Sequence, residues 1–213
     1  SAGNASSPLS VNTFVVDTTS PSLSVVTAAT TPTKDPTPSY AFSSNEAGTI
    51  SYGGSCSSGT TSASSGTNSI SFSTLSDASY SNCTITVTDS AGNASSALSV
   101  NTFAVDTTVP SISQVTAVAT LTNDSTPDYV FSSSEAGTIT YEGSCSSSTT
   151  SVTTDNNTIT LVSLGNGTYS DCTITVTDSA GNTSSSLTIT SFTVNTAIGV
   201  FGTSLFNESF LGD

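Results

Sequence analysis

Acidic residues recur in this sequence at a fixed spacing, and their side chains could bind a metal ion. Two sets of three acids, each followed by an Asn four positions after its last acid, lie 89 positions apart. They are Asp17, Glu46, Asp89 and Asn93, and then Asp106, Glu135, Asp178 and Asn182. Ca²⁺ takes about six to eight oxygen ligands from carboxylates, amides and backbone carbonyls. We therefore expect a calcium site in each repeat. The alternative is that each Asp only caps a turn through hydrogen bonds to the backbone, with Glu46 solvated.

Four cysteines follow the same spacing. Cys56 and Cys83 are 27 positions apart, and Cys145 and Cys172 repeat that separation. Four cysteines allow three connectivities, and the repeat symmetry favours one bridge within each repeat over buried free thiols. A metal site is less favoured, because the chain has no His and no Cys-x-x-Cys spacing. Disulfides of this kind persist outside the reducing cytosol, so we expect the protein to be extracellular.

The 89-residue period divides the chain. Ser-Ala-Gly-Asn stands at residues 1–4, 90–93 and 179–182, and self-similarity at a fixed period is typical of an array of like modules. We predict that residues 1–16 are the last strand of a preceding, truncated repeat and that residues 17–105 and 106–195 are two full repeats. Residues 196–213 are then a non-repeat apolar tail.

The composition argues against several functions. The chain has no His, Trp, Met or Arg, its one basic residue is Lys34, and its formal charge is −14. The chain lacks the basic residues that would activate a Ser or Thr for acid-base or nucleophilic catalysis, so we expect no enzyme activity. Nucleic acid would be repelled, because phosphate contacts require Lys and Arg. Apolar runs are only a few residues long, which argues against membrane insertion by this segment.

Alternation of apolar and polar residues with period two predicts an all-β fold. In the first full repeat it predicts seven strands, near residues 22–27, 39–43, 49–52, 60–64, 69–74, 82–88 and 97–105. Seven short strands in about 90 residues is the size of an immunoglobulin-like β-sandwich. Cys56 would then end the third strand and Cys83 would begin the sixth, its antiparallel neighbour in one sheet. The bridge is expected to clamp those two strands.

A tyrosine precedes the sixth strand in each repeat. Leu75 and Leu164 stand five positions before Tyr80 and Tyr169, which is the place of a tyrosine corner, whose hydroxyl bonds back to the backbone. Tyr80 is out of phase with the alternation that starts at Cys83, so we predict a β-bulge between them. In this topology the three acids of each set fall in the preceding linker and in two loops at the same end of the sandwich.

These features together resemble a known group of proteins. Asp-Thr-Thr-x-Pro at residues 17–21 and 106–110, the Leu-to-Tyr corner, and Thr-Val-Thr-Asp-Ser-Ala-Gly-Asn at residues 86–93 and 175–182 are similar to the bacterial Ig-like repeats of large surface adhesins. The likeness covers about residues 1–195. It implies a structural, non-catalytic stalk or spacer of tandem sandwiches on the cell surface, stiffened by Ca²⁺ at the junctions between neighbouring repeats.

The two ends of the chain leave alternatives open. Residues 1–16 either belong to a longer array or complete another subunit by strand exchange, a form of β-augmentation. The tail holds a cluster of apolar residues that either begins a different domain or docks on a neighbouring subunit: Phe201, Leu205, Phe206, Phe210 and Leu211. The alternative function is therefore a subunit of a self-assembling extracellular filament. A carbohydrate-binding module is disfavoured, because exposed aromatic residues are not clustered.

Overall fold

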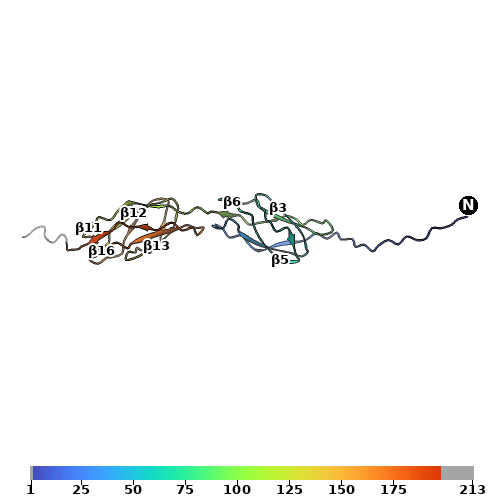
Figure 1. The fold of residues 1–213 in the computed structure, drawn as a ribbon, viewed down its shortest axis with the longest axis horizontal. Coiled ribbons are helices and arrows are strands. Elements are labelled where there is room, and N and C mark those ends of the chain that lie inside the picture. Colours follow the sequence, from blue (N-terminus) through green and yellow to red (C-terminus); the bar gives the residue numbers. More distant parts are fainter. Residues whose placement is uncertain (1, 198–213) are drawn as a thin grey trace, which may run out of the picture. The chain divides into compact units, whose positions relative to one another are not determined.

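The computed structural model describes residues 2–197, and every regular element in that part of the chain is a β-strand (Figure 1). No helix long and apolar enough to span a membrane occurs among these residues. The predicted all-β sandwich fold with two disulfides is confirmed. The chain forms two compact units. The first holds the residues up to Thr30 with Thr37–Leu75 and Ser79–Phe103, and the second holds Thr31–Pro36, Ser76–Ala78 and the residues from Ala104 onward.

The first repeat contains nine short strands. They are β1 (Leu23–Thr27), β2 (Ser39–Ser44), β3 (Gly48–Gly53), β4 (Ser62–Ala63), β5 (Gly66–Ser71), β6 (Ala78–Tyr80), β7 (Thr84–Thr88), β8 (Leu98–Ser99) and β9 (Phe103–Val105). One sheet has the order β1-β2-β5, the other has the order β4-β3-β7-β8, and β6 pairs with β9. Because β3 and β7 are antiparallel neighbours, with Ile50 opposite Val87, the predicted pairing of the third and sixth strands is correct.

The second repeat has the same arrangement with one more short strand. Its elements are β10 (Ile112–Thr116), β11 (Leu121–Thr122), β12 (Asp128–Ser133), β13 (Gly137–Glu142), β14 (Ser151–Val152), β15 (Asp155–Thr160), β16 (Gly167–Tyr169), β17 (Thr173–Thr177), β18 (Leu187–Thr188) and β19 (Phe192–Val194). The sheets have the orders β10-β12-β15, β14-β13-β17-β18 and β11-β19-β16. The β11–β19 pair is parallel. The first repeat has only an isolated parallel bridge there, between Thr33 and Val105.

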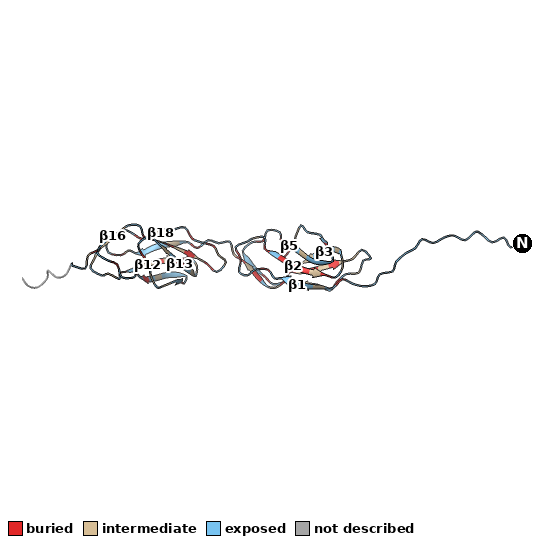
Figure 2. Ribbon diagram, turned by 90° about the horizontal axis from the view of Figure 1, so that it is seen from below, coloured by how far each residue is buried: buried red, intermediate tan, exposed pale blue. Residues whose placement is uncertain are grey.

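The core of each repeat lies between its sheets, and the alternation along the strands decides which side chains enter it. On β7, Ile85 and Val87 are fully buried, while the three threonines that alternate with them are half-buried. Figure 2 shows buried, intermediate and exposed residues along the strands of both repeats. Phe72 and Phe103 stack in the first core with ring centroids 5.7 Å apart. Such aromatic pairs add to the stability that burial of apolar surface supplies.

Two predicted local features differ from the structure. The last strand, predicted as continuous, is split into β8 and β9, and the residues between them include Asn101, whose side chain binds the backbone of Ala29. The bulge predicted between Tyr80 and Cys83 is wrong. Tyr80 lies on its own strand β6, which pairs with β9, and the chain then joins another sheet at β7. This change of sheet buries both Tyr80 and Ile85 without a bulge.

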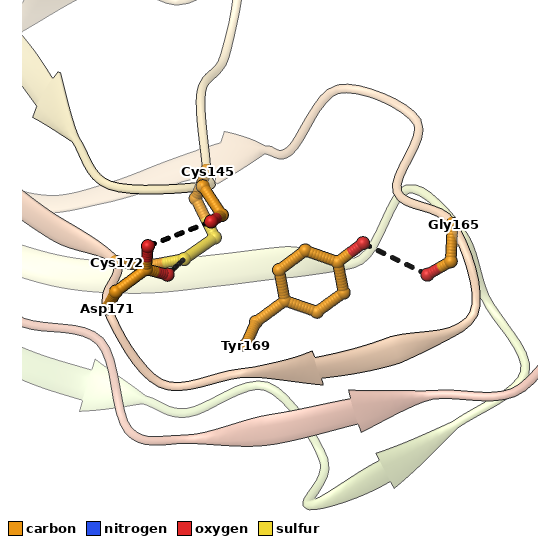
Figure 3. The surroundings of a disulfide bond; sticks show 6 residues. Cys145, Gly165, Tyr169, Asp171 and Cys172 are labelled. Carbon is orange, nitrogen blue, oxygen red and sulfur yellow. Dashed lines mark hydrogen bonds between the residues drawn. A yellow bond between two sulfur atoms is a disulfide. The ribbon is translucent and has the colours of Figure 1, made fainter.

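A disulfide holds the same end of each sandwich, and a tyrosine corner lies near it in the second repeat. Cys56–Cys83 and Cys145–Cys172 each join the segment after one strand to the start of its sheet neighbour, with Cα atoms 5.3 Å apart. The predicted bridges within each repeat are therefore confirmed. The Tyr169 hydroxyl donates a hydrogen bond to the Gly165 carbonyl at 3.0 Å, close to the bridge in Figure 3.

The predicted apolar cluster of the tail, Phe201 to Leu211, lies outside the described residues. At the other end of the chain, residues 2–16 form no strand and are exposed.

Candidate cation sites

The fold brings the first set of acids together. Asp17 precedes β1, Glu46 lies between β2 and β3, and Asp89 follows β7. One carboxylate oxygen from each lies within 4.8 Å of the other two. Glu46 and Asp89 are half-buried and Asp17 is exposed, so the three charges gather at the surface where the chain enters the sandwich.

The second set gathers in the same way within the second unit. Asp106, Glu135 and Asp178 also present oxygens within 4.8 Å of one another. This cluster is less exposed than the first, because Asp178 is buried while Asp106 and Glu135 are half-buried. The sequence prediction that each set shares one end of its sandwich therefore agrees with the geometry.

A tight turn after β7 fixes the Asp89 carboxylate. Its Oδ1 accepts hydrogen bonds from the backbone N–H groups of Ala91 and Asn93, both at 2.8 Å. Gly92 adopts φ 94°, a left-handed conformation that glycine adopts without steric cost. Asp89 is therefore a turn cap, as the alternative interpretation held, and it also belongs to the cluster. The two roles coexist in one side chain.

A buried serine places each Glu. The Ser44 hydroxyl donates to the Glu46 carbonyl at 2.6 Å, and the Ser44 hydroxyl oxygen accepts from the Glu46 N–H at 3.3 Å. Ser133 makes the matching bonds around Glu135, at 2.6 and 3.4 Å. Ser44 and Ser133 are only 2% and 3% exposed, so this loop is anchored in the sandwich. Sequence reasoning missed these serines, although each stands two residues before its Glu in both repeats.

The two asparagines join the acids of each set. The Asn182 side-chain NH₂ donates to the Asp106 carbonyl and to the Asp178 carboxylate, both at 2.8 Å. Asn93 makes the same pair of bonds to Asp17 and Asp89 at 3.1 and 2.9 Å. Asn93 and Asn182 were predicted as ligands through their oxygens. In the structure their nitrogens hold the linker backbone against the loop, which gives them a positioning role, and the role of their oxygens as ligands stays a prediction.

Charges in the second cluster act on one another. Burial raises the pKa of Glu135, and the neighbouring negative charges of Asp106, Asp178 and Asp77 raise it further. Burial also opposes ionisation of Asp178, but hydrogen bonds from Asn182, Gly181 and Ala180 outweigh that effect and lower its pKa. Asp178 is thus held ionised while Glu135 is pushed towards its neutral form, which is the effect of like charges sharing a site.

Asp77 is an acid that the 89-residue spacing does not select. It lies in the Ser76–Ala78 segment of the second unit. Its carboxylate accepts hydrogen bonds from the N–H and hydroxyl of Thr107, at 2.9 and 2.8 Å, and from the hydroxyl of Thr108 at 2.9 Å. The Thr107 and Thr108 donors lower the pKa of Asp77, so its negative charge persists beside Glu135. Its counterpart 89 positions later is Asn166, so a search for recurring acids could not find it.

The donor set fits a hard cation. Three carboxylates converge on one point in each repeat, and carboxylate oxygens are the ligands that Ca²⁺ prefers. Thiolate and imidazole ligands are absent, since all four cysteines form disulfides and the chain has no His. Without a cation the carboxylates repel one another, and binding of Ca²⁺ would relieve that repulsion. Asp17, Glu46 and Asp89, and likewise Asp106, Glu135 and Asp178, are the groups that would hold the ion.

Comparison with known proteins assigns no family. No family model matches the chain, and no curated protein matches it. Among solved structures, it is similar to SGBP-B of the Bacteroides ovatus mixed-linkage glucan utilization locus in complex with a mixed-linkage heptasaccharide, at 16% identity and a TM-score of 0.21. The likeness covers 75% of this chain and 42% of that chain. At this TM-score it supports no conclusion about function.

Proposed function

We propose that this chain is a structural, non-catalytic stretch of tandem Ig-like sandwiches in an extracellular bacterial surface protein, where it serves as a calcium-stiffened spacer. The observation that carries the proposal is the carboxylate cluster that forms at the same place in both repeats. Each cluster joins an acid of the incoming linker, Asp17 or Asp106, to two loop acids of the sandwich. A cation held there fixes the linker to the sandwich.

The two disulfides support an extracellular location. Each closes a loop of about 28 residues within one small sandwich, which stabilises the fold mainly by restricting the unfolded chain. Such bridges persist in oxidising compartments. The acidic surface, with a formal charge of −14, favours a soluble and extended array rather than association with nucleic acid or anionic lipid.

The test measures the dimensions of the intact chain by small-angle X-ray scattering, in Ca²⁺ and in chelator. We expect a narrower distribution of dimensions and a higher melting temperature in Ca²⁺. The variant Asp106→Asn removes one linker charge and keeps the acceptor oxygen that binds the Thr108 N–H at 3.1 Å. It should lose the Ca²⁺ effect on the second sandwich.

The matched control is Asp155→Asn. Asp155 is an exposed acid outside both clusters, and its φ of 73° is tolerated by Asn. It changes the net charge by the same amount and should leave the Ca²⁺ response intact. If Ca²⁺ alters neither the scattering nor the melting of the parent chain, the calcium-stiffened spacer is refuted.

A filament subunit is the second candidate. The observation in its favour is the run of exposed apolar side chains before β1, with Leu9 91% and Phe14 75% exposed. Strand complementation through this segment, or docking of the apolar tail, would join identical subunits. Electron microscopy of the intact chain separates the candidates, because a filament subunit forms polymers on its own and a spacer remains single.

A further inference from the structure

The exposed segment before the first sandwich closely duplicates a buried strand. Residues 1–16 differ from residues 90–105 at two positions only, Pro8 against Ala97 and Val15 against Ala104. The later copy contains β8 and β9 and completes the first sandwich. The earlier copy forms no strand from residue 2 onward, and it leads away from β1 as an exposed segment in Figure 2.

The environments of the two copies are opposite. Val100, Phe103 and Val105 are 5%, 0% and 2% exposed, and their counterparts Val11, Phe14 and Val16 are 81%, 75% and 74% exposed. In the core, Phe103 stacks on Phe72 and on Tyr80, with ring centroids 5.7 and 5.3 Å apart. A run of apolar side chains this exposed is typical of an interaction surface.

The polar contacts of the buried strand also have their counterparts in the segment. The buried Ser95 hydroxyl accepts from the Val87 N–H at 3.0 Å, and the Asn101 side chain exchanges two hydrogen bonds with the backbone of Ala29, at 2.9 and 3.0 Å. Ser6 and Asn12 occupy these positions in the segment. It therefore carries the apolar and the polar groups that a last strand needs.

The two substitutions fit the same role. Ala97 is exposed, and Pro is tolerated at strand edges and before strands. Ala104 is half-buried, and its counterpart in the second repeat is the β-branched Thr193 on β19. A Val therefore suits this position.

The sequence of the segment also distinguishes between the two repeat types. In the second repeat, Thr190 stands where the first has Asn101, and its N–H and hydroxyl bind Gln114 at 3.4 and 2.9 Å. The neighbouring core residue there is Ile189, 1% exposed, where the first repeat has Val100. A segment with Val11 in the place of Ile189 would underfill that core, and its Asn12 would replace the contact that Thr190 makes with the exposed Gln114.

We propose that residues 2–16 are the last strand of a further sandwich of the first-repeat type, which precedes the described ones, and that Val11 and Asn12 select that type. This rests on the proposed function, because it treats the chain as part of an array. The partner is defined by its chemistry: an antiparallel β-sandwich that lacks its last strand and presents an apolar cleft together with a free backbone N–H and C=O at the position of Ala29.

The test extends the intact chain in two ways. In one variant residues 17–89 are duplicated in front of Ser1, and in the other residues 106–178 are placed there. In the first we expect a third cooperative unit with a third disulfide. Amide exchange at Val11, Phe14 and Val16 should slow on the order of a hundredfold or more relative to the parent chain. The added unit of the second variant should melt at a lower temperature than the added unit of the first variant.

The substitution Phe14→Asp is the matched control. It should leave the melting of the parent chain unchanged, because Phe14 is exposed there, and should abolish only the added unit of the extended chain. The proposal is overturned if the added unit stays unfolded while the two described sandwiches keep their melting transitions. Equal melting of the two added units would overturn the selection by Val11 and Asn12.

Self-association of the parent chain is the competing outcome. If the parent chain forms oligomers that Phe14→Asp dissolves, the partner is a second copy and a preceding sandwich is wrong. Calcium titration of the second sandwich in the same chains keeps the two proposals separate. A retained Ca²⁺ response with an unfolded added unit overturns the inference and leaves the spacer function standing.

Discussion

Replacing Glu135 with Gln should stabilise the second sandwich in chelator and destabilise it in Ca²⁺. Without a cation the Glu135 carboxylate lies within 4.8 Å of the carboxylates of Asp106 and Asp178. Two unit charges at that separation repel by about 1 kcal/mol in water and by about 3.5 kcal/mol at an effective dielectric constant near 20. Glu135 is half-exposed, so the lower figure applies to each pair. Removing its charge should stabilise the cation-free second sandwich by about 1–2 kcal/mol.

In Ca²⁺ the same substitution should destabilise. A ligand at one hundred times its dissociation constant stabilises the folded state by about 2.7 kcal/mol. The variant loses one of three carboxylates and with it most of that gain. For a sandwich of about 90 residues, 1 kcal/mol corresponds to a shift in melting temperature of about 4–8 °C. The variant should therefore melt above the parent in chelator and below it in Ca²⁺.

The pH dependence of stability provides an independent test of the repulsion at Glu135. The folded-state pKa of Glu135 is raised, so the folded chain binds more protons than the unfolded chain in the range just above the ordinary Glu pKa. In chelator, stability should fall as the pH rises through that range, and Glu135→Gln should remove the slope. Asp178 and Asp77 have lowered pKa values. Their contribution is instead lost as the pH falls below the ordinary Asp pKa, so the two windows are separate.

The assay is differential scanning calorimetry of the intact chain in chelator and in Ca²⁺, with Glu142→Gln as the control. Glu142 ends β13, is exposed and lies outside the cluster. Its replacement changes the net charge equally and should leave both melting temperatures unchanged. The reasoning is refuted if Glu135→Gln behaves like Glu142→Gln in chelator, because the carboxylates then do not repel. An undiminished Ca²⁺ response of Glu135→Gln would exclude Glu135 as a ligand.

Three further outcomes follow from individual contacts. Replacing Cys145 and Cys172 by Ser should cost about 3.5 kcal/mol, from the entropy of a loop of about 28 residues, and chemical denaturation checks this; no loss would show that the bridge does not stabilise the sandwich. Tyr129→Phe should leave stability unchanged or raise it, because the buried hydroxyl has no partner among the described residues. Tyr169→Phe should instead cost about 0.5–1.5 kcal/mol, because it loses the hydrogen bond to Gly165. Asp77→Ala should speed amide exchange at Thr107 roughly tenfold or more, while Asp77→Asn should not; equal exchange in the two variants would contradict the contact.

The period of the sequence explains why so much of the fold was predictable. Apolar residues that alternate in both repeats place the same strands in both, so the strands that carry Phe42 and Ile85 follow from sequence alone. The disulfide pairing follows from the repetition, because a bridge within each repeat lets every copy form the same closed module with the same separation of 27 positions. The split of the last strand did not follow, since it coincides with a long-range contact of Asn101 with the backbone of Ala29.

The candidate sites were predictable in part for the same reason. Acids that recur were found, and the fold brings them together. Asp77 was missed because its counterpart is the amide Asn166. Asn93 and Asn182 were assigned to the right place, but the direction in which an amide points depends on its neighbours and cannot be read from spacing. The hydroxyls of Tyr40 and Tyr129, which have no partner within residues 2–197, likewise depend on packing.

The linker after the second repeat shows that the hydrogen bonds made by Asp77 and Asp106 do not require their charge. Asn166 accepts from the N–H and hydroxyl of Thr196 at 2.9 and 3.0 Å, as Asp77 does from Thr107. Asn195 accepts from the Ala197 N–H at 3.1 Å, as Asp106 does from Thr108. The turn geometry therefore needs only an acceptor oxygen, which an amide supplies without repulsion.

The two positions are carboxylates, Asp77 and Asp106, in the linker that meets Glu135 and Asp178. They are amides, Asn166 and Asn195, where the sequence departs from the repeat after Asn195. Placing two further negative charges beside existing ones is unfavourable unless something neutralises them. A turn cap alone gives no reason for that choice, since Asn166 and Asn195 make the same bonds. The proposed cation beside Asp106, Glu135 and Asp178 would give one.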